Sequence, residues 1–115
     1  MHHNPKRILV MLNKQSDTAN YIRNIVNKNI PDATIILYGS RSRGDFRSDS
    51  DWDFLILVDR LNLTFDERSD LEYKLWSAGQ DIGEEVNPLV YTKKQWESLP
   101  PSLFKINIKN EGIKL

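Results

Sequence analysis

The sequence contains no cysteine, and this absence excludes two kinds of site. Neither disulfide bonds nor thiolate metal centres can form without thiols. A chain without disulfides agrees with a reducing compartment, and we therefore expect a cytoplasmic protein.

Long apolar runs and net charge are also missing. No hydrophobic stretch approaches the length of a membrane span and no signal peptide is visible, so we expect no membrane partner. The 16 basic and 16 acidic residues cancel to a formal charge of zero. The chain as a whole therefore has no electrostatic attraction to nucleic acid, which disfavours such a partner but leaves it open.

The length indicates one small domain. A chain of 115 residues with 39% hydrophobic residues can form a single modest core. We expect one domain spanning residues 1–115, with residues 1–5 as a disordered leader. Whether the chain forms homo-oligomers is left open.

The stretch from Gly39 to Val58 carries the chemistry. Apolar runs on either side, residues 33–38 and 54–58, are predicted to be buried strands. Asp51 and Asp53 stand two positions apart at the start of the second strand. Because side chains alternate in a strand, both carboxylates are predicted to share one face, with Trp52 on the other.

Two like charges on one face call for a shared cation. Carboxylate oxygens suit Mg²⁺ or Mn²⁺, which bind through one or two carboxylates together with substrate phosphates. A Gly39-Ser40 turn lets backbone approach a phosphate, and Arg41 and Arg43 can neutralise its charge. The pattern predicts a metal–triphosphate site for in-line transfer at phosphorus.

Simpler interpretations exist for the same residues. The aspartate cluster can be a solvated loop whose acids are balanced by neighbouring arginines, and Gly-Ser-Arg can be an ordinary turn. A calcium-binding EF-hand loop that opens at Asp49 would require glycine at position 54 and an acid at position 60. The sequence has Phe54 and Arg60 there, which excludes that loop.

The remaining segments predict alternating helices and strands. A third strand is expected over 86–91, where Pro88 indicates a sheet edge or a bulge. Helices are expected at 6–12, from Ser16 to about Asn29, after 64, after 92 and over 102–109. Capping boxes mark two of their starts, with Thr and Glu or Gln at 64 and 67 and at 92 and 95. This order predicts an α/β or α+β domain.

A family resemblance rests on these residues. Gly39-Ser40, ten intervening residues and then Asp51-Trp52-Asp53, within Gly-Ser-Arg-Ser-Arg-Gly-Asp, resemble the signature of minimal nucleotidyltransferases in the DNA polymerase β-like superfamily. The resemblance implies a small mixed sheet flanked by helices. It also implies that ATP or another nucleoside triphosphate binds with Mg²⁺ or Mn²⁺ and donates its nucleoside monophosphate to an acceptor hydroxyl, releasing pyrophosphate.

One position departs from the family pattern. Members usually carry a third carboxylate on the third strand, as a metal ligand or a base, and the matching residue here is Asn87. An amide oxygen can bind a cation but cannot act as a base at neutral pH. Glu85, two residues earlier on the same strand face, is the alternative catalytic carboxylate.

The resemblance also suggests a partner. Many minimal nucleotidyltransferases are encoded beside a helical HEPN-type toxin, so a protein acceptor is our first expectation. The alternative is a binding module of weak or no catalytic activity, which holds nucleotide or a partner protein. The replacement of the third acid by Asn87 favours this alternative more than a complete motif would.

Overall fold

The computed structural model describes residues 5–115, and for residues 5–16 it describes the backbone alone. The predicted leader therefore lies outside the described residues, except for Pro5, at which the first helix begins. Along the chain the elements are α1 (Pro5–Asn29), β1 (Thr34–Tyr38), α2 (Ser40–Arg43), β2 (Trp52–Val58), α3 (Phe65–Asp81), β3 (Val86–Thr92), α4 (Lys93–Ser98), α5 (Leu103–Glu111) and β4 (Ile113–Lys114).

The strands form one mixed sheet. Its order is β3-β2-β1-β4, with β1 antiparallel to both β2 and β4, and β2 parallel to β3. This architecture confirms the expected mixed sheet flanked by helices. Pro88 lies in β3 at the edge of the sheet, where a missing backbone donor costs no ladder bond on the outer side.

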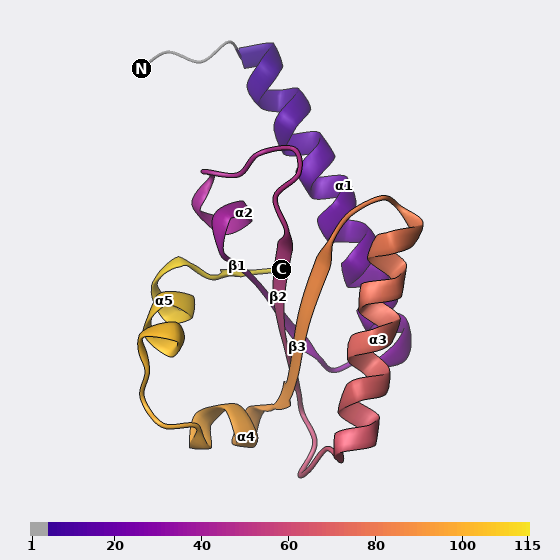
Figure 1. The fold of residues 1–115 in the computed structure, drawn as a ribbon, viewed down its shortest axis with the longest axis vertical. Helices are drawn as coiled ribbons and strands as arrows, with labels where there is room; N and C mark the ends of the chain where they lie inside the picture. Colours follow the sequence, from indigo (N-terminus) through magenta and orange to yellow (C-terminus); the bar gives the residue numbers. More distant parts are fainter. Residues whose placement is uncertain (1–4) are drawn as a thin grey trace.

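Helices cover the two faces of the sheet unequally. In Figure 1, α1 and α3 lie side by side along one flank of the sheet, and α4 and α5 lie on the other. The core joins α1, α3 and the buried side chains of β1, β2 and β3, including Ile22, Leu75, Leu37, Phe54 and Val90. None of the helices in residues 5–115 has the length and hydropathy that a membrane crossing requires.

Strand alternation decides which side chains enter this core. In β1, Ile35 and Leu37 are buried against α1 and α3, whereas Ile36 and Tyr38 are only half-buried. Trp52 and Phe54 of β2 are likewise buried, while Asp53 between them is half-buried. The face that carries Tyr38 and Asp53 is therefore less completely covered.

Both predicted capping boxes are present. The hydroxyl of Thr64 accepts from Glu67 N at 3.2 Å while Thr64 N donates to the Glu67 carboxylate at 3.2 Å. Thr92 and Gln95 make the same reciprocal pair at the start of α4. These bonds satisfy N–H groups that the first helical turn leaves open.

The prediction was wrong for the N-terminal helices. Two were expected, with Ser16 as the N-cap of the second, but α1 continues through that position. The connecting residues 13–15, Asn-Lys-Gln, include neither glycine nor proline, so no backbone constraint ends the first helix there. The short elements α2 and β4 were not predicted.

Candidate functional site

The two aspartates meet at the end of the sheet next to Asn87. In the strand register Asp53 stands opposite Tyr38 on one side and opposite Asn87 on the other. The Asn87 amide Nδ2 donates to Asp51 Oδ2 at 3.0 Å and to Asp53 Oδ1 at 3.2 Å. One amide group reaches both carboxylates, so the two acids share a face of the sheet, as the alternation along β2 predicts.

The surroundings of Asp53 disfavour its charged form. Burial raises the pKa of Asp53, and the neighbouring charge of Asp51 raises it further. The Asn87 hydrogen bond and the Arg43 charge act in the opposite direction. Burial, with added repulsion from Asp53 and Tyr91, also raises the pKa of Tyr38 to about 12. A cation bound between the carboxylates would offset this repulsion.

The residues present fit one divalent cation shared with phosphate oxygens. Over residues 17–115, whose side chains the structure describes, no group of three or more His, Asp or Glu side chains is arranged around a metal position. The site instead offers two carboxylates, to which the Asn87 amide presents its N–H groups. Two carboxylates suit Mg²⁺, which completes its shell with substrate phosphates and water.

Gly39 brings the backbone against the acid pair. Its φ of 76° and ψ of −158° belong to a region that only glycine adopts readily. A β-carbon at this position would overlap Oδ2 of Asp53. Gly39 also serves as the N-cap of α2, so Ser40, the next residue, occupies the first helical position. The predicted turn and the predicted aspartates are therefore adjacent in space.

Arg43 lies at the solvent-exposed side of the site. Its guanidinium is 3.3 Å from Asp45 Oδ2 and 3.1 Å from Glu111 Oε1. The side chain is 45% exposed to solvent. Its positive charge acts to lower the pKa of Asp53. An exposed arginine of this kind can exchange carboxylate partners for a phosphate.

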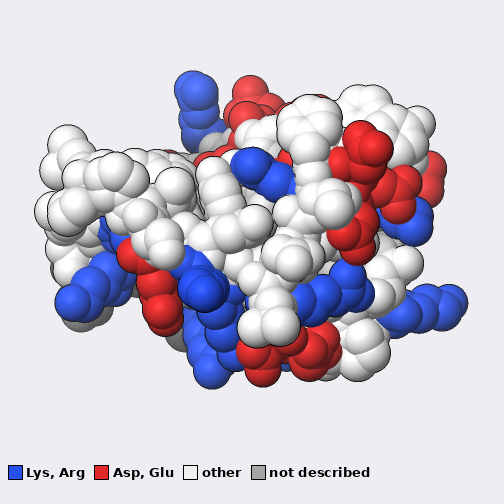
Figure 2. Space-filling model, turned by 90° about the horizontal axis from the view of Figure 1, so that it is seen from below, with Lys and Arg blue, Asp and Glu red and all other residues white. Residues whose placement is uncertain are grey.

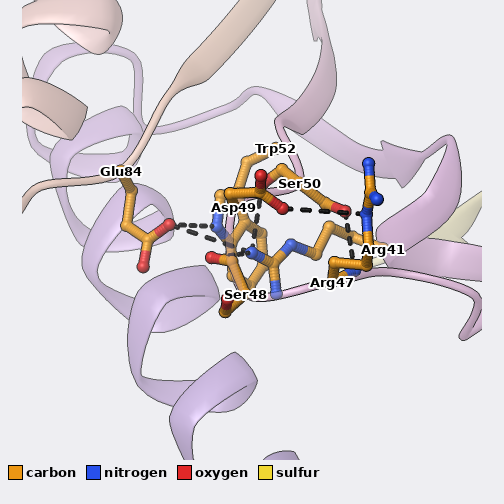
Figure 3. Close-up of polar contacts among 7 residues, drawn as sticks. All are labelled: Arg41, Arg47, Ser48, Asp49, Ser50, Trp52 and Glu84. Atoms are coloured by element: carbon orange, nitrogen blue, oxygen red, sulfur yellow. Dashed lines mark hydrogen bonds and ion pairs between the residues drawn. The ribbon is translucent and has the colours of Figure 1, made fainter.

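Arg41 occupies the interior. Only 6% of the residue is exposed, and its guanidinium lies between the rings of Phe46 and Trp52, at 4.5 and 4.4 Å from their centroids. It donates to the carbonyl oxygens of Ser48 at 3.4 Å and Ser50 at 3.0 Å (Figure 3). The structure therefore places Arg41 beneath the aspartate loop, which it supports, rather than beside the exposed carboxylates.

The glutamates before β3 also face away from the acid pair. Glu84 accepts a hydrogen bond from Trp52 Nε1 at 3.1 Å and lies 3.9 Å from the Arg41 guanidinium (Figure 3). Glu85 accepts from Trp76 at 3.2 Å and Gln80 at 3.0 Å, both on α3. The structure does not bring Glu85 to the aspartates, because the residue precedes β3 and strand alternation does not orient it.

Tyr38 and Glu84 were not among the predicted site residues. Tyr38 directly precedes Gly39 and shares the face of Asp53, but this follows only from the register between β1 and β2. Glu84 supports the site from beneath through Trp52 and Arg41. Its contacts join segments more than thirty residues apart, for which the sequence has no local signal.

Comparisons with known proteins found solved structures of similar fold. The chain resembles a crystal structure of a toxin-antitoxin with AMP-PNP, with a TM-score of 0.60 and 24% identity over 83% of this chain and 69% of that one. It also resembles a toxin-antitoxin MntA-HpeT structure with a Tyr-to-Ala mutation, at a TM-score of 0.60 and 24% identity over 84% of this chain and 70% of the other.

A further MntA-HpeT structure, in which two aspartates are replaced by glutamate, matches at a TM-score of 0.58 and 21% identity, over 83% of this chain and 69% of that one. Identities this low establish a shared fold. Comparison with curated proteins found no match. A family model described as nucleotidyltransferase domain matches residues 19–115, which include every residue of the candidate site. The chain belongs to the nucleotidyltransferase domain family.

Proposed function

We propose that this domain binds a nucleoside triphosphate with Mg²⁺ at the acid pair and transfers its nucleoside monophosphate to a hydroxyl group of a partner protein. One observation carries the proposal. The Asn87 amide reaches both Asp51 and Asp53, and the Gly39 backbone lies against the Asp53 carboxylate. A cation position and a phosphate-binding turn are thereby adjacent.

Each residue has a distinct role in this proposal. Asp51 and Asp53 hold the cation, which when bound neutralises charge on the phosphates and on the departing pyrophosphate. Gly39 and Ser40 position phosphate oxygens with backbone N–H groups and the serine hydroxyl. Arg43, which already acts electrostatically on Asp53, adds positive charge at the exposed side.

Two of the structural neighbours support the nucleotide and the acid pair. One contains AMP-PNP, a non-hydrolysable analogue of ATP. Another carries glutamates in place of two aspartates that are two positions apart, the same spacing as Asp51 and Asp53. ATP is therefore our first choice among nucleoside triphosphates. Asp51 and Asp53 are our choice as ligands of the cation that binds with it.

The neighbours also support a protein partner. All three are toxin-antitoxin structures. Together with the resemblance to minimal nucleotidyltransferases, this favours a helical HEPN-type protein as the acceptor and a reducing cytoplasm as the site of action.

Asn87 is the reason to weigh a second function. Its amide cannot take the proton that the acceptor hydroxyl loses as the new P–O bond forms, and Glu85 is bonded to α3. The proton would pass to water, so turnover would be slow. A domain that binds nucleotide and partner without transfer is the alternative that this residue favours.

Labelled ATP separates the two functions. The purified domain is incubated with Mg²⁺ and lysate from the same cells, using ATP labelled at the α-phosphate in one sample and at the γ-phosphate in another. Incorporation of the α-label alone into a protein indicates nucleoside monophosphate transfer. Mg²⁺-dependent ATP binding by calorimetry without incorporation indicates the binding module, and the absence of binding contradicts both functions.

A further inference from the structure

Large apolar side chains are exposed on α5 and β4. Leu103 is 74% exposed, Ile106 50%, Phe104 44% and Ile113 44%. We call these four residues the α5–β4 surface. Scattered exposed apolar residues are ordinary, but several on adjacent elements form a patch of the kind that marks an interaction site.

A cavity of about 460 Å³ lies beside this surface. Its apolar lining comes from β1, α4 and α5, with Ile36, Trp96, Ile106 and Ile108. Ile106 belongs both to the cavity and to the α5–β4 surface, so the two are continuous. The volume is sufficient for one or two large side chains from a bound segment.

Three lysines, Lys105, Lys109 and Lys114, also line the cavity. Among the described residues, none of the three is within ion-pair distance of a carboxylate, although the chain as a whole is neutral. Lys105 Nζ donates to the Leu99 carbonyl at 2.9 Å. The cavity therefore combines an apolar interior with uncompensated positive charge at its edge.

The view from below agrees with this distribution. On the side where α4 and α5 lie in Figure 1, the molecule presents a broad uncharged area (Figure 2). Lys and Arg side chains border one edge of this area, with some acidic side chains among them. Together with the apolar lining of the cavity, this arrangement fits an amphipathic ligand rather than a wholly polar one.

We propose that the α5–β4 surface and its cavity bind an acidic, amphipathic segment of a partner protein. An apolar side chain of that segment enters the cavity, and flanking carboxylates pair with Lys109 and Lys114. The positive edge selects acidic partners, because a basic segment would be repelled there. The apolar surface extends beyond the cavity, which favours a protein segment over a small molecule.

A second copy of the chain fits this surface less well. The acidic side chains of α3 are largely engaged, because Glu67, Asp70 and Glu72 form ion pairs with neighbouring basic residues, and α3 lies across the sheet from α5 (Figure 1). Pairing α3 of one copy with α5 of the next would be head-to-tail and would tend toward open chains rather than a closed dimer.

The surface also leads to the acid pair. The ring of Phe104 packs against those of Tyr38 and Trp96, with distances between ring centroids of 5.6 and 6.1 Å. Tyr38 in turn stands opposite Asp53 in the sheet. A segment docked on α5 would thus lie on the sheet face that carries the carboxylates. The statement that this segment belongs to the acceptor rests on the proposed function, whereas the binding surface itself does not.

Peptide display tests the surface without knowledge of the partner. Randomised twelve-residue peptides are selected on the whole protein, and the affinity of selected peptides is measured by fluorescence anisotropy. We expect enrichment of Asp and Glu together with a large apolar residue. Ile106→Ser, or Lys109→Glu combined with Lys114→Glu, should each weaken binding by about tenfold or more. Lys28→Glu, on the exposed side of α1, is the matched charge control.

Three outcomes would overturn the proposal: selection of basic peptides, binding that both cavity variants retain, or a concentration-dependent dimer in sedimentation that Ile106→Ser dissociates. Circular dichroism confirms that the variants fold, which is expected because Ile106, Lys109 and Lys114 are all exposed. Peptide binding is measured without nucleotide. A failure of ATP binding would therefore contradict the proposed function while leaving the result for this surface intact.

Discussion

Gly39 and Asp53 lie so close together that a β-carbon on the glycine would overlap a carboxylate oxygen of the aspartate. The contact joins the turn after β1 to the acid pair at the start of β2. It explains why glycine is required here on two grounds, the backbone dihedral angles and the space. It also means that any group bound at the turn will be next to the carboxylates.

Gly39→Ala should therefore damage both stability and the site. We expect a loss of about 1–3 kcal/mol in the free energy of unfolding from the backbone conformation alone, with displacement of Asp53 in addition. Gly44→Ala is the matched control, because Gly44 also has positive φ but a β-carbon added to it would meet no atom within 4 Å. Urea denaturation measures both variants. Equal losses, with nucleotide binding kept by Gly39→Ala, would contradict the role of this contact.

Replacing both aspartates should separate binding from folding. Asp51→Asn combined with Asp53→Asn is expected to abolish Mg²⁺-dependent ATP binding in calorimetry. The fold should be retained, because the substitution removes repulsion between two acids as well as the metal ligands. Asp49→Asn serves as control, since that side chain is 81% exposed and pairs with Arg47. Unchanged affinity in the double variant would refute the assigned roles.

The raised pKa of Asp53 predicts how stability depends on pH without metal. Between the ordinary value of 3.8 and the raised folded-state value, the folded protein binds more protons than the unfolded chain. The free energy of unfolding should consequently fall as pH rises through this window. Asp53→Asn should lose this contribution and gain stability relative to wild type toward neutral pH.

Thermal unfolding across about pH 3.5–7, with and without Mg²⁺-ATP, measures this difference. Bound Mg²⁺-ATP should stabilise the wild type and leave Asp53→Asn unaffected. A wild-type curve parallel to that of Asp53→Asn in metal-free buffer would show that the carboxylate is not perturbed by its surroundings.

Asn87→Asp should restore the missing carboxylate. The new side chain would face the acid pair where the amide now donates to both acids. We expect lower stability without metal, because three acids repel, and a transfer rate higher by roughly a hundredfold, because a base becomes available. Single-turnover transfer of α-labelled phosphate to the acceptor measures the rate.

Glu85→Gln tests whether Glu85, rather than residue 87, supplies the third catalytic group. The Glu85 carboxylate accepts from Trp76 and Gln80, so its removal should leave the transfer rate unchanged and affect only the packing of α3. If Glu85→Gln abolished transfer while Asn87→Asp had no effect, the third catalytic group would be Glu85 after all.

Local chemistry determined much of this protein. The paired aspartates share a face because strand side chains alternate with a period of two, and the capping boxes at Thr64 and Thr92 follow from hydrogen bonds within one helical turn. These features depend on neighbours in the sequence and could be predicted from it. The closeness of Gly39 to Asp53 depends in addition on the antiparallel register of β1 and β2, which places Tyr38 opposite Asp53.

The tertiary structure alone decided which distant residues complete the site. Asn87 reaches the aspartates through the parallel register of β2 and β3, whereas Glu85, two residues earlier, is held by α3. Arg41 is buried because two aromatic rings and carbonyl groups of the aspartate loop surround it. Register and burial depend on how separate segments pack together, and a pattern read along one segment does not contain that information.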